Sequence, residues 1–376
     1  MAKWRYELNT RILALFFLVA MPFVAVGSFI VVRMARVALR ESIGAAIEQR
    51  AIETKLQVER YVGGNVVQLR LISLEPQVRT ALAASPAQPG GDELKRLEQA
   101  WASGEAKLLA SVTANPVGAR LRDVITVNPG FKLLQVVDTR GRLLATSARG
   151  GRVWNADAPW FKGVMAAEGR AWMSDIQRPP GAGGAYFEMA YPVTHPVDGR
   201  WLGAIRAVVD PLDLYAVLAP VRVGRTGHAV LLRASDGTVL ASDETDRVLA
   251  AKFPGFRFLE AARNARKGYW ITDEIRKTVA PDTAPVLIEP ERIVGWSPVD
   301  QVPDVQWLVT VEQHLNEALA PIDGVTGYLL VHFIGVFATV ILLAAYFSFK
   351  LEKPVIEEAL HLHEDHVPKP ANVSEG

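Results

Sequence analysis

Two long apolar stretches, one near each end of the chain, limit what this sequence can fold into more than any other feature. Residues 12–32 contain no charged side chain, and residues 327–349 contain only His332 as a group that could carry a charge. A helix of about 20 apolar residues crosses the hydrocarbon core of a bilayer, which is about 30 Å thick. The sequence therefore predicts two transmembrane helices, with a lipid bilayer as one partner of the chain.

Each stretch also allows a second interpretation. Ala25-Val26-Gly27 resembles a signal-peptide cleavage site, but the apolar run continues to Val32, which favours a retained anchor. The second stretch could be the core helix of a globular domain. Its aromatic residues Tyr328 and Tyr346 instead fit the two interfaces of a membrane.

Two spans place both ends of the chain on the same side of the membrane. Basic residues flank the first span on both sides, so charge orients it weakly. Long loops are translocated regardless of their charge. We therefore expect the region between the spans to lie in the periplasm, with both spans in a bacterial inner membrane. The spans (12–32 and 327–349) leave a cytoplasmic N-terminus (1–11) and a short cytoplasmic tail (350–376).

Composition and motifs argue against several classes of function. The net charge is +1, which does not predict the basic face of a nucleic-acid-binding protein. The absence of cysteine excludes disulfides, thiolate metal sites and cysteine nucleophiles. The histidines after the second span, His361, His363 and His366, lack the spacing of a zinc motif and are expected in a solvated tail. We predict no catalytic residue, no metal site and no cofactor, and we do not expect an enzyme.

A long helix is predicted directly after the first span, at residues 33–84. Apolar residues recur every three or four positions between Val37 and Val62, and charged residues occupy the other faces. Such a helix could carry motion along its axis from the membrane. A homodimer seam along part of it is one hypothesis. Packing of the helix on its own domain is the alternative, and both can hold at once.

Four phrases in the central region occur twice, in the same order. Residues 137–147 (VDTRGRLLATS) match residues 233–243 (RASDGTVLASD) as a strand, a glycine turn and a returning strand. The other matches are 172–175 with 270–273, 191–193 with 296–299, and 200–203 with 306–309. They predict two tandem α+β modules, each an antiparallel sheet with helices. The membrane-distal module is expected at 85–220 and the membrane-proximal module at 221–325.

This arrangement resembles the double Cache family of extracytoplasmic sensor domains, which have two tandem PAS-like modules on a long helix. Residues 157–164 (DAPWFKGV) are similar to the family's helix start, 188–193 (EMAYPV) to its pocket strand, and 202–210 (LGAIRAVVD) to the strand that ends in aspartate. The resemblance covers about residues 33–349. It implies a small ligand in the distal module, between the sheet and a cover of loops and a helix.

The resemblance also implies roles for single residues. In members that bind amino acids, an arginine holds the ligand carboxylate and an aspartate holds the ammonium group. Asp210 matches that aspartate. Ala158 stands at the arginine position, with Arg152 nearby, and this departure argues against a standard α-amino-acid ligand.

The first module contains the residue types that a small-metabolite pocket needs, namely aromatic walls and a few polar groups. The candidates are Trp154, Asp157, Trp160, Trp172, Tyr186, Glu188, Tyr191 and Asp210. On a strand, Tyr186 and Glu188 share a face, whereas Tyr191 points the other way. Glu188 and Asp210 in one aromatic pocket would favour an amine or another cationic ligand.

Each candidate also has a structural interpretation. Trp160 and Trp172 could be ordinary core residues. Asp157 and Asp210 each lie close to a proline at an expected helix start and could cap those helices. The proline- and glycine-rich residues 178–184 lack the P-loop signature and indicate a flexible connection or a lid.

The function that these patterns favour is an extracytoplasmic small-molecule sensor anchored in the membrane. The tail after residue 350 is too short for a kinase, a cyclase or a methyl-accepting region. A partner protein is therefore expected to supply the output. The main alternative is a membrane-anchored scaffold or assembly protein that uses its PAS-like modules for protein contacts. A further alternative is a membrane-anchored enzyme with an unusual site.

Overall fold

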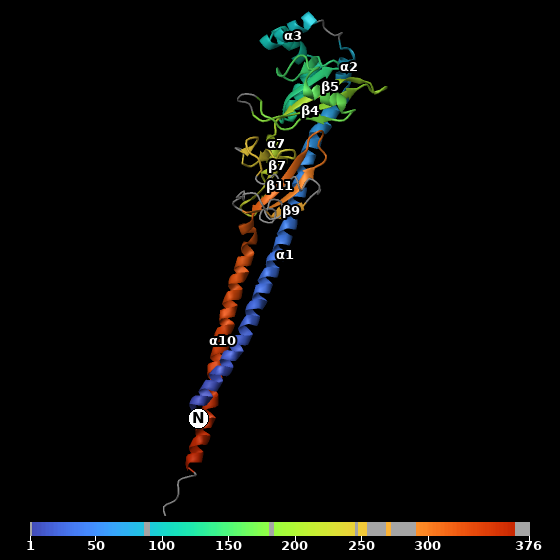
Figure 1. The fold of residues 1–376 in the computed structure, drawn as a ribbon. Coiled ribbons are helices and arrows are strands. Elements are labelled where there is room, and N and C mark those ends of the chain that lie inside the picture. Colours follow the sequence, from blue (N-terminus) through green and yellow to red (C-terminus); the bar gives the residue numbers. More distant parts are fainter. Residues whose placement is uncertain are drawn as a thin grey trace, which may run out of the picture. The chain divides into compact units, whose positions relative to one another are not determined.

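The computed structural model describes residues 2–85, 91–179, 184–244, 247–253, 268–271 and 291–364 (Figure 1). The chain divides into two compact units. Residues Ser42–Ala318 form one unit, and Met1–Glu41 together with Leu319–Gly376 form the other.

Two long helices supply the second of these units. Helix α1 runs from Ala2 to Leu74 and helix α10 from Leu315 to Glu364. By length and composition, the segments Pro22–Leu74 and Leu315–Leu343 each contain a window apolar enough to cross a membrane. Large apolar side chains such as Phe23, Phe29 and Leu342 are exposed on these helices. The prediction of two long apolar helices is confirmed.

Helix α1 ends ten residues before the predicted boundary at residue 84. Pro76 has no backbone N–H, and its ring disfavours helical geometry at the preceding residue. Glu75 accordingly has extended dihedral angles, and a separate short helix, α2 (Pro76–Ala83), begins at Pro76. The sequence pattern missed this break because the apolar period continues across it.

The first module combines helices with a five-stranded antiparallel sheet in the order β2-β1-β5-β4-β3. The strands are β1 (Phe131–Asp138), β2 (Leu143–Thr146), β3 (Trp172–Met173), β4 (Phe187–Thr194) and β5 (Trp201–Val209). The helices are α3 (Gly91–Ser103), α4 (Ala106–Thr113), α5 (Pro116–Val127) and α6 (Pro159–Ala166). Helix α7 (Leu212–Leu218) follows β5 and packs on the second module.

The second module repeats this connectivity. Its described strands are β6 (Arg222–Val223), β7 (Gly227–Arg233), β8 (Val239–Ser242), β9 (Gly268–Ile271), β10 (Arg292–Val299) and β11 (Trp307–His314). They pair in the order β6-β7-β11-β10-β9, and β8 pairs with β7. The path β8-β7-β11-β10-β9 therefore matches β2-β1-β5-β4-β3. The predicted fold class, with two tandem antiparallel-sheet modules on a long helix, is confirmed.

Strand pairing also defines which residues of the two sheets are equivalent. Gln135 lies opposite Thr146, and Val230 lies opposite Ser242, so Gln135 and Val230 are equivalent. Gln135 also lies opposite Arg206, and Val230 opposite Thr310, so Arg206 and Thr310 are equivalent.

By the same pairing Trp307 takes the place of Gly203, not of Trp201, and Gly268 takes the place of Trp172. Two of the four predicted phrase matches, 172–175 with 270–273 and 200–203 with 306–309, are therefore wrong by two residues. The register of β4 and β5 shifts between Val193 and Thr194, and such an irregularity is invisible to phrase matching.

Helix α1 supports both sheets (Figure 1). Its residues near Ile47 lie so close to Gly295 of β10 that a side chain there would meet the helix backbone. Further along, Tyr61 donates a hydrogen bond of 3.4 Å to the Asp210 carbonyl of the first module. One helix therefore fixes both modules within the larger unit.

Candidate ligand-binding site

Three polar side chains meet on one face of the first sheet, where most neighbours are apolar. Arg206 of β5 donates a hydrogen bond of 2.7 Å to Gln135 of β1 and forms an ion pair with Glu188 of β4. The side chains of Arg206 and Glu188 are only 12% and 11% exposed. The Arg206 guanidinium carbon lies 5.4 Å from the ring centre of Trp160, which belongs to helix α6. These contacts offset the cost of removing two charges from water.

The second module lacks this cluster, although it has the same sheet. The positions equivalent to Gln135 and Arg206 are Val230 and Thr310. Glu188 pairs with Val208 as Val294 pairs with Glu312, so Val294 is the equivalent of Glu188. The fold therefore does not require these three side chains at these positions. The second sheet has its buried ion pair elsewhere, between Arg292 and Glu312.

A cavity of about 520 Å³ opens beside Glu188, at the junction of the two modules. From the first module it is lined by Pro159, Trp172, Met173, Ser174, Asp175, Gln177 and Glu188, and from the second by Arg233, Ser235, Asp304, Val305 and Gln306. Its walls thus hold one indole, three carboxylates and one guanidinium. Asp304 has a left-handed backbone, with φ of 55°.

Asp175 is the polar centre of this cavity. One of its carboxylate oxygens forms an ion pair with Arg233 Nε, and the other accepts a hydrogen bond of 2.9 Å from Trp307 Nε1. Trp307 is fully buried and packs edge-on against Phe187, with ring centres 6.3 Å apart. Asp175 and Phe187 belong to the first module and Arg233 and Trp307 to the second, so these contacts join the modules.

Four of the predicted residues lie at or next to this site. Trp172 and Glu188 line the cavity. Trp160 is buried under Arg206, in the core between the sheet and α6. Tyr186 forms an isolated bridge with Gln177, and burial together with the negative charge of Glu188 raises the pKa of its hydroxyl.

Trp172 also has a structural role. Its indole packs against Gly163 of α6. A Cβ at that position would lie 2.2 Å from the ring nitrogen, so the packing requires glycine there.

Of the other four, Trp154, Asp157 and Tyr191 do not line the cavity. Asp157 is exposed and accepts a hydrogen bond of 3.0 Å from Arg152, which lowers its pKa. It is not a helix cap either, because Ala158 takes the N-cap position of α6. Trp154 packs against the core, and Tyr191 is paired with Ile205 on the opposite face of the sheet, as its position in the strand predicts.

The fourth, Asp210, is not in the cavity. It accepts a hydrogen bond of 3.0 Å from the Leu212 N–H at the start of α7 and pairs with Lys132 at 3.0 Å. Pro211 takes the N-cap position of α7, so Asp210 is not the cap itself, although its side chain binds the N–H of the first helical residue. Asp210 does not line this cavity with Glu188, because β5 ends before Asp210 and the Leu212 N–H binds its carboxylate. Asp175 and Asp304 are the acids that share the cavity with Glu188.

The comparisons with known proteins give structural neighbours only. No family model and no curated protein matches the chain. The ligand-binding domain of the Pseudomonas aeruginosa amino acid chemoreceptor PctC, in complex with GABA, is 18% identical, with a TM-score of 0.44; the match covers 70% of this chain and 95% of that one. That of the Pseudomonas fluorescens chemoreceptor CtaA, in complex with L-isoleucine, is 14% identical, with a TM-score of 0.47 and coverages of 76% and 98%.

A third neighbour is the ligand-binding domain of the Campylobacter jejuni chemoreceptor Tlp3, in complex with 4-methylisoleucine. It is 13% identical, with a TM-score of 0.49 and coverages of 74% and 94%. At this level of identity, what these domains bind does not determine what this chain binds.

Sequence reasoning missed Gln135, Arg206, Asp175, Arg233 and Asp304. Arg206 had a detectable signal, because it is the one charged residue in the apolar strand Trp201–Val209. Asp175 belongs to a repeated phrase, but its partners are 58 and 132 residues away in the sequence. Contacts between residues so far apart in the sequence cannot be predicted from a short sequence motif.

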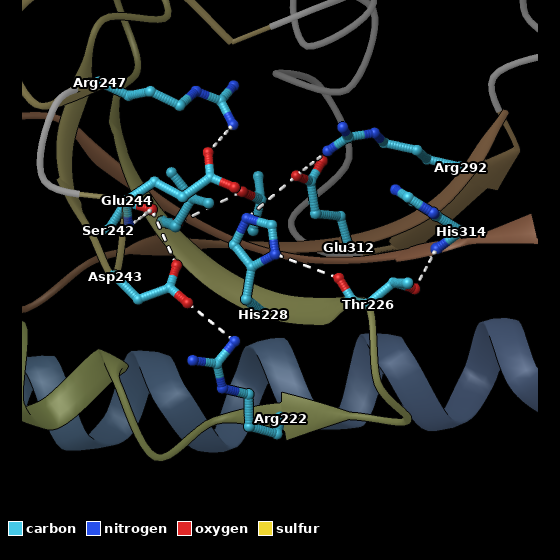
Figure 2. A network of polar contacts seen from close by, with 12 residues as sticks. Arg222, Thr226, His228, Ser242, Asp243, Glu244, Arg247, Arg292, Glu312 and His314 are labelled. Atoms are coloured by element: carbon cyan, nitrogen blue, oxygen red, sulfur yellow. Dashed lines mark hydrogen bonds and ion pairs between the residues drawn. The ribbon is translucent and has the colours of Figure 1, made fainter. Parts of the chain in front are cut away.

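The second module has a polar network of its own at the other end of its sheet (Figure 2). Figure 2 shows the His228 ring between two acceptors, with Nε2 3.2 Å from a Glu312 oxygen and Nδ1 3.3 Å from the Thr226 carbonyl oxygen. Arg292 forms an ion pair with the same Glu312 carboxylate, which is 1% exposed. None of these residues lines the cavity between the two modules.

No group of three or more metal-ligating side chains occurs among the described residues. His366 of the predicted solvated tail lies outside them, as do the side chains of His361 and His363.

Proposed function

We propose that this chain is a membrane-anchored receptor whose first module binds a small molecule outside the cytoplasm. The observation that carries the proposal is the contrast between the two sheets. Gln135, Glu188 and Arg206 stand where the second sheet has Val230, Val294 and Thr310, respectively. Buried polar groups cost stability unless they are paired with one another, and one member of this group, Glu188, also lines a cavity of ligand size.

The ligand that suits the cavity is a small amine or another organic cation. Asp175, Glu188 and Asp304 line it, against one lining arginine, Arg233. Even with Arg206 counted beside Glu188, negative charges are in excess. The Trp172 ring at the wall can contribute a cation–π contact. The volume of about 520 Å³ lies within the usual range for metabolite pockets.

The wider arrangement follows from the two apolar helices. The chain would cross a bacterial inner membrane twice, with Ser42–Ala318 in the periplasm. Strand β11 is followed directly by α10, so the sheets have a covalent route to the membrane. A homodimer and a separate signalling partner complete the proposal, and no catalytic role is assigned to the chain.

A thermal-shift experiment on the full chain in lipid nanodiscs tests the proposal. Choline, ethanolamine and putrescine serve as probes, because a ligand that binds the folded state raises its melting temperature. Asp304→Asn removes one cavity charge and tolerates the left-handed backbone, so it should weaken binding about five-fold while the protein stays folded.

Asp198→Asn, on an exposed loop, is the matched control and should bind as the unchanged chain does. A chain that melts cooperatively but responds to no small molecule in a broad metabolite screen would support the scaffold function instead.

A further inference from the structure

The carboxylate of Asp175 already has a cationic partner from the other module. Arg233 and Trp307 are directly paired residues on β7 and β11, and both hold this carboxylate, one on each oxygen. The side chains of Asp175 and Arg233 are about 30% exposed, so the pair is open to the cavity. An organic cation in the cavity would meet Arg233 at the same acceptor.

The fold does not require Arg233 and Trp307 at these two positions. The pair Asp138 and Gly203 of the first sheet occupies the positions of Arg233 and Trp307. Gly203 has φ of 152°, and a Cβ there would lie 2.1 Å from a backbone carbonyl oxygen, so that position cannot hold a large side chain in the first module. Arg233 and Trp307 are therefore particular to the second sheet, where they face the first module.

We propose that the cavity is a binding site shared by both modules, in which Arg233 is a tethered competitor for the ligand cation. Without ligand, Arg233 occupies the Asp175 carboxylate. A bound organic cation displaces it, because two like charges held next to one carboxylate repel each other and only one of them can take the position that Arg233 Nε occupies. This inference rests on the proposed function and adds how the second module takes part in binding.

Displacement of Arg233 has a consequence for the second module. The hydrogen bond from Trp307 to the other oxygen of Asp175 remains. The Arg233–Asp175 ion pair, which helps to fix the position of that carboxylate, is lost. Trp307 is the first residue of β11, and His314, the last, directly precedes α10. Binding at the cavity thus acts on the strand that leads to the second apolar helix.

The experiment compares Arg233→Gln with Arg222→Gln in the full chain in nanodiscs. Arg222 is also in the second module and forms an ion pair with Asp243, but it does not line the cavity. The affinities for choline, ethanolamine and putrescine are measured by calorimetry. Removing a competitor raises the apparent affinity by the inverse of the competent fraction. We expect R233Q to bind at least about three-fold more tightly than the unchanged chain, and R222Q to bind within about two-fold of it.

Hydrogen exchange gives the second readout. In the absence of a probe, R233Q should reproduce across residues 307–314 the exchange pattern that the unchanged chain shows at saturating probe. R222Q should not. Arg233→Met, which keeps the side-chain length, repeats both measurements if R233Q does not fold.

The outcomes separate the inference from the proposed function. Weaker or equal binding by R233Q, with the unchanged chain binding normally, overturns the competitor role and leaves the receptor function standing. Binding of the probes by R233Q alone supports the inference. If neither chain binds any probe, both the cationic ligand class and the competitor role are overturned.

Discussion

Glu312 is a carboxylate whose two oxygens are buried next to His228 and Arg292 (Figure 2). One of these oxygens has no hydrogen-bond partner within the described part of the chain. A carboxylate in such a place is tolerated because the guanidinium compensates its charge. Loss of one member of a buried ion pair leaves the other charge uncompensated.

We therefore expect Glu312→Gln to lower the free energy of unfolding by about 3 kcal/mol. Thermal unfolding of the full chain measures the effect. The matched control is Glu244→Gln in the same network, because Glu244 is 47% exposed and pairs with Arg247 at the surface. Such a pair contributes less than about 1 kcal/mol. Equal effects of the two substitutions would show that the Glu312 cluster is not a buried ion pair.

For single residues, the sequence predicted which types of side chain line the cavity better than it predicted where each candidate residue lies. Trp172 and Glu188, which the sequence offered as ligand contacts, line the cavity between the modules. Asp210 does not line it, and its carboxylate binds the start of α7, because a carboxylate at a strand end can serve a helix start equally well. Asp175 and Arg233 could not be paired without the fold, because packing of the two modules brings them together.

Helix α1 carries an apolar stripe that the sheets do not cover. Leu56, Val67, Leu71 and Leu74 are between 44% and 60% exposed, and they lie on one face of the helix. Gly63 and Gly64 on the same helix have open space where a Cβ would be. A second copy of the chain packed on this stripe would remove apolar surface from water.

If α1 forms the homodimer seam, Leu71→Cys should form a disulfide between two copies in the membrane under mild oxidation. Val197→Cys, on an exposed loop of the first module, is the control and should remain largely monomeric. Non-reducing electrophoresis distinguishes the two variants. Absence of the Leu71→Cys dimer at protein levels where cross-linkers detect oligomers would exclude this face as the seam.

Elements were predicted more reliably than their boundaries. The apolar period of α1 and the two glycine-turn hairpins at 137–147 and 233–243 are local signals, and all three elements exist. The end of α1 at Leu74 and the register shift beside Val193 depend on one proline and one irregular pairing. Such features change the geometry without changing the hydrophobic pattern.

For the molecule as a whole, the absence of cysteine allows a direct test of membrane topology. Val197→Cys should react with a membrane-impermeant maleimide in intact spheroplasts, because Val197 is 88% exposed in the proposed periplasmic unit. Ala2→Cys should react only after the cells are lysed. Labelling of both sites, or of neither, before lysis would contradict a two-pass arrangement with the central region outside.

The cavity between the modules has a consequence in the opposite direction. Coupling between two binding equilibria is reciprocal, so whatever changes the second module changes the affinity for ligand by the same factor. If the ligand displaces Arg233, then a protein that binds β11 or α10 and changes their conformation also changes the affinity for the ligand. A cytoplasmic protein bound to the end of α10 would then change the ligand concentration at which the cavity is half occupied.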